Sequence, residues 1–207
     1  MKNTCPLCEN SGIAFFKDEF FECVNCKGIF RNPQSYPDQN SEKSRYEEHN
    51  NDVCDPGYQK FVSPITSFVM KNFKAEDSGL DYGCGPGPVV AKVLTDKNYN
   101  IKLFDPFFKN DVDLLKEKYS YIVCCEVIEH FHQPKKEFRK LKEMLKNDGK
   151  LICMTHIYTP DIPFDNWYYK NDQTHVFIYQ KETIEFIKEC FKFSSVMVDK
   201  KLVVFSS

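Results

Sequence analysis

The glycine-rich turn at residues 80–87 constrains the fold of this chain more than any other feature. Its sequence is LDYGCGPG, and an apolar run that is typical of a helix follows at residues 89–94. A buried strand ending near Asp81, a tight turn and a helix form the first half of a strand–helix–strand unit. The glycines at 83, 85 and 87 let the backbone approach a nucleotide-like ligand, where any side chain would obstruct it.

The spacing of these glycines excludes two common phosphate-binding turns. One residue separates the last two glycines, whereas the dinucleotide-binding turn has two, and no Lys-Ser or Lys-Thr pair follows as in a nucleoside-triphosphate loop. The pattern D-x-G-x-G-x-G instead resembles the first motif of class I S-adenosylmethionine-dependent methyltransferases. An ordinary strand–helix turn is the alternative. The resemblance implies a cofactor-binding set formed by Asp81, Tyr82, Gly83, Cys84, Gly85 and Gly87.

A second strand is predicted at residues 100–104, and it ends at Asp105-Pro106. The interval from Asp81 suits one strand–helix–strand unit. An acidic residue at the end of the second strand is well placed to accept hydrogen bonds from both ribose hydroxyls. We therefore expect Asp105, with Pro106, to contact the ribose of the cofactor. A helix cap or turn role for Asp105 is the alternative.

The order of the later elements extends the resemblance from about residue 60 to the C-terminus. An apolar strand at 121–125 leads into EVIEHFH, an exit that resembles ubiquinone-type O-methyltransferases. Then come an amphipathic helix at 134–145, a stop at Asn147-Asp148-Gly149, a strand at 150–154, a helix at 183–191, and strands at 195–199 and 202–205. We predict an α/β, doubly wound, Rossmann-like sheet of the seven-stranded methyltransferase type with an antiparallel terminal strand pair.

One region departs from that pattern. Only the fifteen residues 106–120 separate Asp105 from the next strand, which is too few for a full strand and a full helix. We expect this part of the sheet to be shortened, and we assign no residue to the adenine.

Two Cys-x-x-Cys pairs lie near the N-terminus, Cys5 with Cys8 and Cys23 with Cys26, and fourteen residues separate the pairs. This spacing predicts a structural zinc ribbon with four thiolate ligands. About 35 residues cannot build a core of their own, so the metal would supply the folding free energy. Disulfide or redox cysteines are the alternative. We divide the chain into a zinc ribbon (1–35), a linker and lid segment (36–60) and a methyltransferase domain (61–207), with residues 32–41 as the natural linker.

Charge and composition limit the partners. The formal net charge is −2, and the first 45 residues carry six basic and six acidic side chains, so the ribbon lacks the basic excess expected of an RNA grip. Nineteen Phe and eleven Tyr allow a substantial core. The sequence shows no signal peptide or transmembrane run. We expect a cytoplasmic protein without a membrane partner, and the oligomeric state stays open.

Three groups of polar side chains are candidates for the methyl-transfer point. The first precedes the first sheet strand, where related enzymes fold a lid over the cofactor. It contains Tyr46, His49 and Tyr58, which we expect near the methionine end of the cofactor or the substrate. An ordinary amphipathic surface helix is the alternative.

The second group is Glu126, Glu129 and His130, whose spacing puts them on one face if the chain turns helical there. With His175, the pattern resembles the divalent-metal site of small-RNA 2′-O-methyltransferases. The resemblance implies Mg²⁺ held by these four residues, where it would lower the pKa of a substrate hydroxyl. In the alternative, which we favour, Glu126 lines the cofactor site, and Glu129 and His130 orient the loop through hydrogen bonds.

The third group is the segment 164–177, which follows the fifth strand and contains the single tryptophan, two tyrosines and His175. Aromatic walls with a few polar tips suit a small-molecule pocket. His175 is the best candidate for a general base, because histidine ordinarily titrates near neutral pH. Glu126 and His130 are the other catalytic candidates. The alternative is a packed loop in which His175 makes a structural hydrogen bond.

These motifs together favour an S-adenosylmethionine-dependent methyltransferase that acts on a small molecule. Two alternatives stay open. A ribbon ahead of a methyltransferase also resembles the ribosomal RNA guanine methyltransferases, although no Asn/Asp-Pro-Pro-Tyr motif follows the strand at 121–125. The chain could also be a non-catalytic, zinc-stabilised binding module, since fold alone does not prove activity. The acceptor and its reacting atom are not evident from the sequence.

Overall fold

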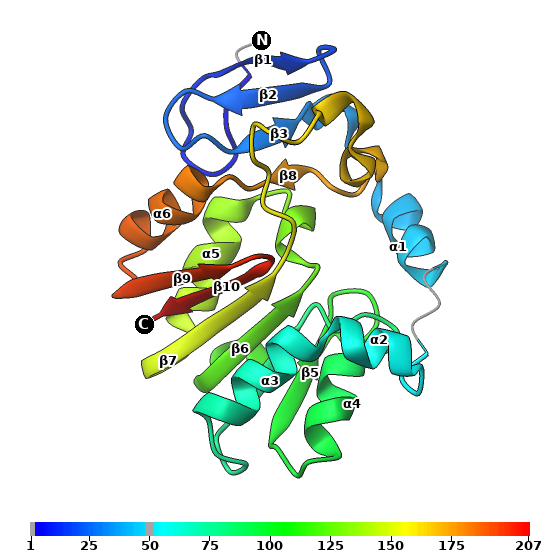
Figure 1. Cartoon of the computed structure of the whole chain (residues 1–207), viewed down its shortest axis with the longest axis vertical. Helices are drawn as coiled ribbons and strands as arrows, with labels where there is room; N and C mark the ends of the chain where they lie inside the picture. Colours follow the sequence, from blue (N-terminus) through cyan, green and yellow to red (C-terminus); the bar gives the residue numbers. More distant parts are fainter. Residues whose placement is uncertain (1–2, 49–51) are drawn as a thin grey trace.

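A six-stranded mixed sheet forms the centre of the larger part of the molecule (Figure 1). The computed structural model describes residues 3–48 and 52–207. The strand order is β5-β4-β6-β7-β10-β9; the first four strands are parallel, and β10 is antiparallel to both of its neighbours. The strands are β4 (Gly79–Tyr82), β5 (Ile101–Phe104), β6 (Tyr119–Cys125), β7 (Leu145–Met154), β9 (Ser195–Asp199) and β10 (Leu202–Ser206).

This architecture confirms the predicted α/β, doubly wound fold with its antiparallel terminal pair. It has one strand fewer than the seven-stranded type. Between β5 and β6 the only helix or strand is the short 3-10 helix η2 (Val112–Lys116), as the length of that segment predicts.

Helices cover both faces of the sheet, and the two-residue period of the strands divides the core between them. On β6, Tyr121 and Val123 pack toward α3 (Ser63–Asn72) and α4 (Val89–Thr95). The alternate residues Ile122 and Cys124 pack in the cluster that contains α5 (Pro134–Glu143) and α6 (Lys181–Cys190). The sheet is therefore buried on both sides, as its apolar strands predict.

One predicted boundary was wrong. We expected a helix to residue 145 and a stop at residues 147–149, but α5 ends at Glu143 and β7 already begins at Leu145. The ladder between β6 and β7 shifts register here, and Asp148 has a φ of 63°. The Asn-Asp-Gly turn is thus an irregularity inside the strand, because pairing of Leu145 with Tyr119 starts the ladder before the turn.

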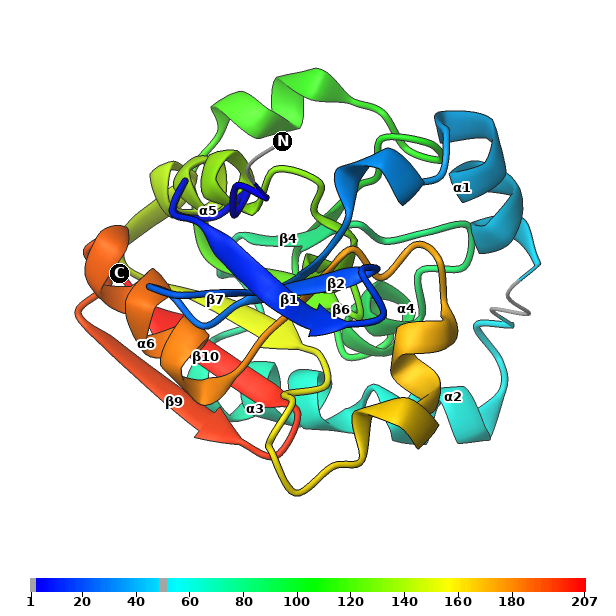
Figure 2. The same ribbon diagram turned by 90° about the horizontal axis from the view of Figure 1, so that it is seen from above.

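The N-terminal ribbon is completed by a strand from the far end of the chain. Its sheet has the order β1 (Gly12–Phe16), β2 (Phe20–Cys23), β3 (Ile29–Arg31) and β8 (Phe177–Ile178). All three pairings are antiparallel, and β8 pairs Phe177 with Phe30. Figure 1 shows β8 between the blue ribbon and the helix α6, and Figure 2 shows β1 and β2 lying over the central sheet. The ribbon therefore shares a sheet with the segment that precedes α6.

The segment between ribbon and sheet is partly helical. It contains the 3-10 helix η1 (Pro33–Ser35), then α1 (Gln39–Glu47) and α2 (Pro56–Phe61), which begin after the N-caps Asp38 and Asp55. Three further 3-10 helices border the site: η3 (Ile128–His130), η4 (Phe164–Asn166) and η5 (Tyr168–Asn171). Within the ranges 3–48 and 52–207, every helix is too short or too polar to span a bilayer.

Candidate functional site

A cleft of about 1490 Å³ lies at the carboxyl ends of β4, β5 and β6. This edge is where open α/β sheets bind their ligands. Every predicted cofactor residue except Gly85 lines it, namely Tyr46, Tyr58, Asp81, Tyr82, Gly83, Cys84, Gly87, Asp105, Pro106 and Glu126. The catalytic candidates Glu126, His130 and His175 line the same cleft, so the structure brings the two predicted sets together.

The glycine turn adopts a backbone that side chains would strain. Gly83 and Gly85 have φ values of +79° and +62°. A Cβ on Gly83 would lie 2.7 Å from the methyl groups of Val127. The amides of Gly83 and Cys84 donate to the carbonyl of Phe104 at 2.8 and 3.2 Å, so the turn is fastened to the end of β5.

Asp105 organises this end of the cleft. Its Oδ2 accepts from the amide of Gly85 at 2.9 Å, and its Oδ1 accepts from the amides of Phe107 and Phe108 at 2.8 and 3.1 Å. The turn role that the sequence left open is therefore present. A carboxylate can accept about four hydrogen bonds, so capacity remains for a ligand hydroxyl in the cleft.

Asp81 is the second carboxyl beside the turn, and it is only 3% exposed. Its pKa is raised to about 7, mainly by burial; the hydrogen bond from the amide of Ala91 opposes this rise, and the negative charge of Asp105 adds a smaller upward contribution. Asp81 is thus partly protonated at neutral pH without a ligand. Burial also raises the pKa of the neighbouring Cys84 thiol. Because the thiolate is the nucleophilic form, this favours a packing role for Cys84 over a role as a nucleophile.

Glu126 follows β6 in a strained conformation. Its φ is 51°, its amide donates to the carbonyl of Met154 at 2.8 Å, and its Oε1 is buried without a hydrogen-bond partner. Burial, followed by the nearby Glu129, raises its pKa to about 9. Glu126 is therefore a neutral carboxylic acid at pH 7, and strain of this kind often marks a functional site.

Glu129 is fully buried and hydrogen-bonded. Its Oε1 accepts from the Tyr169 hydroxyl at 2.5 Å, and its Oε2 accepts from the Thr155 hydroxyl at 3.0 Å. These bonds tie η3 to the end of β7 and to η5. They match the interpretation that we favoured, in which Glu129 orients the loop.

Two histidines complete this network. Nδ1 of His130 lies 3.0 Å from the carbonyl oxygen of Thr174, and Nδ1 of His175 lies 2.7 Å from that of Tyr169. A carbonyl can only accept, so Nδ1 of each ring carries a proton, and Nε2 is the nitrogen that is left to accept one. Burial lowers the pKa of His130 to about 4, which keeps it neutral. The two ring centroids are 4.9 Å apart.

The predicted Mg²⁺ site is only partly assembled. Ligand atoms of Glu129, His130 and His175 lie within 4.8 Å of one another, but Glu126 is outside this group. Two imidazoles and one carboxylate suit Mn²⁺, Fe²⁺ or Zn²⁺ better than Mg²⁺, which prefers oxygen ligands. Both oxygens of Glu129 also accept hydrogen bonds already. The donor set therefore fits Mg²⁺ poorly, and its binding here stays a prediction.

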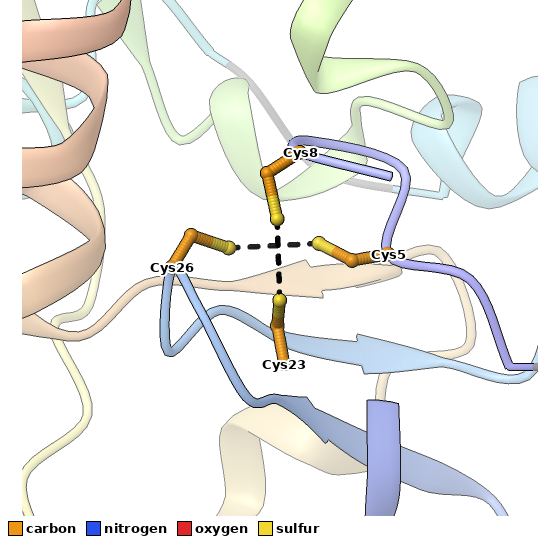
Figure 3. Close-up of side chains that lie close together, drawn as sticks. All are labelled: Cys5, Cys8, Cys23 and Cys26. Carbon is orange, nitrogen blue, oxygen red and sulfur yellow. Dashed lines mark hydrogen bonds between the residues drawn. The ribbon is translucent and has the colours of Figure 1, made fainter. Parts of the chain in front are cut away.

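The four ribbon cysteines form a second group, away from the cleft. Their side chains point toward a common centre from two crossed pairs (Figure 3). Sγ of Cys5 lies 3.5 Å from that of Cys26, and Sγ of Cys8 lies 3.3 Å from that of Cys23. Four sulfurs bound to one Zn²⁺ at about 2.3 Å would be about 3.8 Å apart. The geometry and the thiol donors fit a tetrahedral structural zinc site.

The predicted lid residues cover the cleft from two short helices. Tyr46 in α1 donates to Glu42 Oε1 at 2.7 Å, and its ring centroid lies 5.3 Å from that of His130. Tyr58 in α2 faces the sheet. Its pKa is raised, mainly by burial and to a smaller extent by Cys125, Asp81 and Glu126. The third predicted residue, His49, lies outside the described residues.

His156 and Lys201 are among the cleft residues that were not predicted from the sequence. His156 follows β7 as Glu126 follows β6, so its place after a predicted strand was an available signal. Its Nε2 forms a hydrogen bond of 2.8 Å with the Tyr168 hydroxyl. The residues around Lys201 in the sequence do not indicate that it lies at the cleft. It lies in the β9–β10 turn, and pairing of Leu202 with Met154 brings that turn to the end of β7.

The chain belongs to a methyltransferase family, because residues 46–192 match the family described as methyltransferase domain. The sequence matches none of the curated proteins. The family match covers the strands β4 to β7 of the central sheet, but it ends before β9 and β10.

Solved structures share the fold at low sequence identity. A SAM-dependent methyltransferase from Archaeoglobus fulgidus superimposes with a TM-score of 0.56 at 14% identity, covering 72% of this chain and 94% of that one. The magnesium protoporphyrin IX methyltransferase of Synechocystis, solved with bound SAH, gives 0.52 at 13%, covering 80% and 93%. An O-methyltransferase family protein from Burkholderia thailandensis gives 0.54 at 10%, covering 80% of this chain and 61% of that one.

Proposed function

We propose that this protein is an S-adenosylmethionine-dependent methyltransferase that acts on a small-molecule acceptor. The observation that carries the proposal is the cleft in which the glycine turn, Asp81 and Asp105 meet. Membership of the methyltransferase family supports the reaction, and a structural neighbour with bound SAH supports the cofactor.

The cofactor would lie along the ends of β4 and β5. In this placement Asp105 accepts hydrogen bonds from the ribose hydroxyls. The turn at Gly83 and Gly85, which has no side chains, lets the methionine part of the cofactor lie against the backbone. Asp81 would face the methionine end, and a cationic ammonium beside it would favour its ionised form. Tyr46 and Tyr58 close the cleft from the lid helices.

The acceptor would occupy the part of the cleft near His175. When bound, the cofactor supplies an electrophilic methyl group on a sulfonium. The protein must hold the acceptor atom in line with that methyl and remove its proton. Nε2 of His175 is available as the base, because Nδ1 is committed to the carbonyl of Tyr169. The neutral acid Glu126 can donate a hydrogen bond to the acceptor.

The walls around this point favour a small, partly aromatic acceptor. Tyr46, Tyr168 and Phe107 line the cleft beside the polar groups of His156 and Lys201. Aromatic surfaces with a few polar tips are typical of small-molecule sites. The RNA alternative gains no support from the ribbon, whose third strand pairs with β8 of the same chain.

The test has two parts. Calorimetric titration of the whole protein with S-adenosylmethionine is expected to give one site per chain with micromolar affinity, on the order of 8 kcal/mol. Release of S-adenosylhomocysteine is then followed with a panel of phenols, aromatic acids and amines. Turnover with a panel member supports the proposal. Absence of cofactor binding would overturn the proposal. Turnover with RNA but with no small molecule would show that the acceptor is RNA.

A further inference from the structure

We infer that Arg31, in the last strand of the ribbon, is a positioning residue for the acceptor side of the cleft. Through it, metal binding by the ribbon controls the order of the segment that carries His175. This inference rests on the proposed function for its catalytic meaning, but its structural content can be tested separately.

Arg31 holds three carbonyl groups of that segment. Its amide donates to Val176 at 2.9 Å, and its Nη2 donates to Lys170 at 2.7 Å and to Asp172 at 3.3 Å. The residue is only 6% exposed, and its guanidinium carbon lies 4.5 Å from the centre of the Phe20 ring. Its Nε is buried without a hydrogen-bond partner, so the two Nη2 bonds and the Glu19 carboxylate, 3.9 Å from Nη1, are what stabilise the buried charge. Loss of these carbonyls would leave the guanidinium uncompensated, and this favours one position for the segment.

The carbonyls that Arg31 holds are next to the groups that face the cleft. His175 lies directly before Val176, and the carbonyl that orients its imidazole belongs to Tyr169, directly before Lys170. The same segment is held from the lid side, because Arg45 donates to Oδ2 of Asp172 at 2.9 Å. Arg31 therefore fixes both ends of the loop that sets the direction of the His175 Nε2 atom.

Further contacts tie the ribbon to this segment. Gln180 donates from Nε2 to the carbonyl of Lys27 at 2.6 Å, directly after the second Cys pair. A Cβ on Gly28 would lie 2.3 Å from Phe177, which shows how closely β8 packs on the knuckle. A buried cluster joins ribbon and segment, formed by Phe20, Ile29, Tyr158, Phe164, Trp167, Tyr169 and Ile178.

The path from the cysteine cluster to Arg31 is short. Cys23 ends β2, Cys26 follows three residues later, and β3 begins at Ile29. An ion that holds both cysteines would therefore fix the turn that leads into the strand of Arg31. The cofactor side of the cleft does not depend on the ribbon in this way. The hydrogen bonds of Gly83, Gly85 and Asp105 described above are all made within residues 83–108. Loss of the ribbon metal should disturb the acceptor segment first.

The single tryptophan provides a reporter for this segment. Trp167 is 8% exposed, and its ring centroid lies 5.1 Å from that of Tyr169 and 5.5 Å from that of Tyr158. We expect Arg31→Ala to shift its emission to longer wavelength and to speed exchange of the His175 Nδ1 proton in NMR at least tenfold. Arg31→Lys, which keeps the charge and one donor, should restore part of both signals. The exposed Arg139→Ala is the matched control and should resemble wild type.

The same protein tests the role of the metal. Treatment of the full-length wild type with a zinc chelator should reproduce the Trp167 shift, while the affinity for S-adenosylmethionine changes less than twofold. This arm decides the question even if Arg31→Ala fails to fold. With an acceptor in hand, Arg31→Lys should lower kcat at least tenfold with an unchanged cofactor Kd.

Two results would overturn the inference. One is an Arg31→Ala protein that keeps the wild-type Trp167 emission and slow His175 exchange. The other is a chelated protein that loses cofactor affinity more than tenfold, since the ribbon would then serve the whole fold. If the wild type binds no cofactor at all, the proposed function fails, yet the Trp167 and His175 signals still decide the positioning role.

Discussion

The Nδ1 atom of His175 donates a hydrogen bond to the carbonyl oxygen of Tyr169 at 2.7 Å, and this bond selects the tautomer with a basic Nε2. If that nitrogen removes the acceptor proton, His175→Gln should lower kcat by about 10²–10⁴-fold. The affinity for the cofactor should stay unchanged, because His175 takes no part in the hydrogen bonds of the glycine turn and Asp105. Release of S-adenosylhomocysteine measures the rate. Undiminished turnover would remove His175 as the base.

Asp105 should determine cofactor affinity. Asp105→Asn keeps one oxygen for the amides of Phe107 and Phe108 but loses the charged acceptor. We expect the Kd for S-adenosylmethionine to rise at least tenfold, about 1.4 kcal/mol, as for other hydrogen bonds to charged groups. Calorimetry measures the change. The exposed Asp113→Asn is the control and should bind as wild type does. Equal affinity of the Asp105 variant would refute the ribose contact.

Asp81 should make the stability of the ligand-free protein depend on pH. Its pKa rises from 3.8 to about 7 in the folded state, so the folded protein binds more protons than the unfolded chain between these values. The contribution of Asp81 is complete below pH 3.8 and is lost as the pH rises through about 7. Its size is on the order of 4 kcal/mol, at about 1.4 kcal/mol for each pKa unit.

Asp81→Asn removes this titration. We expect the variant to be more stable than wild type at pH 8 by up to that amount, to lose the advantage near pH 4, and to bind the cofactor more weakly. Urea unfolding at both pH values measures the difference. Asp199→Asn, on the exposed edge strand β9, is the control. A difference between Asp81→Asn and wild type that does not change with pH would contradict the assigned cause.

The ribbon cysteines should bind one zinc ion per chain. Elemental analysis of the purified protein is expected to find about one equivalent, which Cys23→Ser should lose together with several degrees of thermal stability. Cys54→Ser is the matched control, because Cys54 is exposed and outside the cluster. A Cys23→Ser protein that keeps both its zinc and its stability would show that the four cysteines do not form a metal site.

The parts of the fold that were predicted correctly are the parts that local sequence determines. The β9–β10 hairpin follows from two apolar runs around a Lys-Lys turn, and the shortened region after β5 follows from chain length alone. The missed end of α5 has a different cause. Whether residues 145–149 continue a helix or begin a strand depends on the partner strand, and pairing of Leu145 with Tyr119 decides it.

The candidate site divides in the same way. Asp81 and Asp105 could be placed beside the cleft because Asp81 lies at the end of one evident strand and Asp105 directly follows another. Lys201 could not be found, since only the pairing of β10 with β7 brings its turn to the cleft. The role of Arg31 was hidden for the same reason. Nothing near it in the sequence indicates that its partners are Lys170 and Asp172.

The pairing of Ile29 with Ile178 also has a consequence for biosynthesis. The ribosome synthesises β3 well before β8, the fourth strand of the same sheet. Until then the ribbon presents an open hydrogen-bonding edge at Phe30, of the kind that promotes aggregation. The ribbon thus completes its sheet only long after its own strands have been synthesised, and truncations that end before β8 should be prone to precipitate.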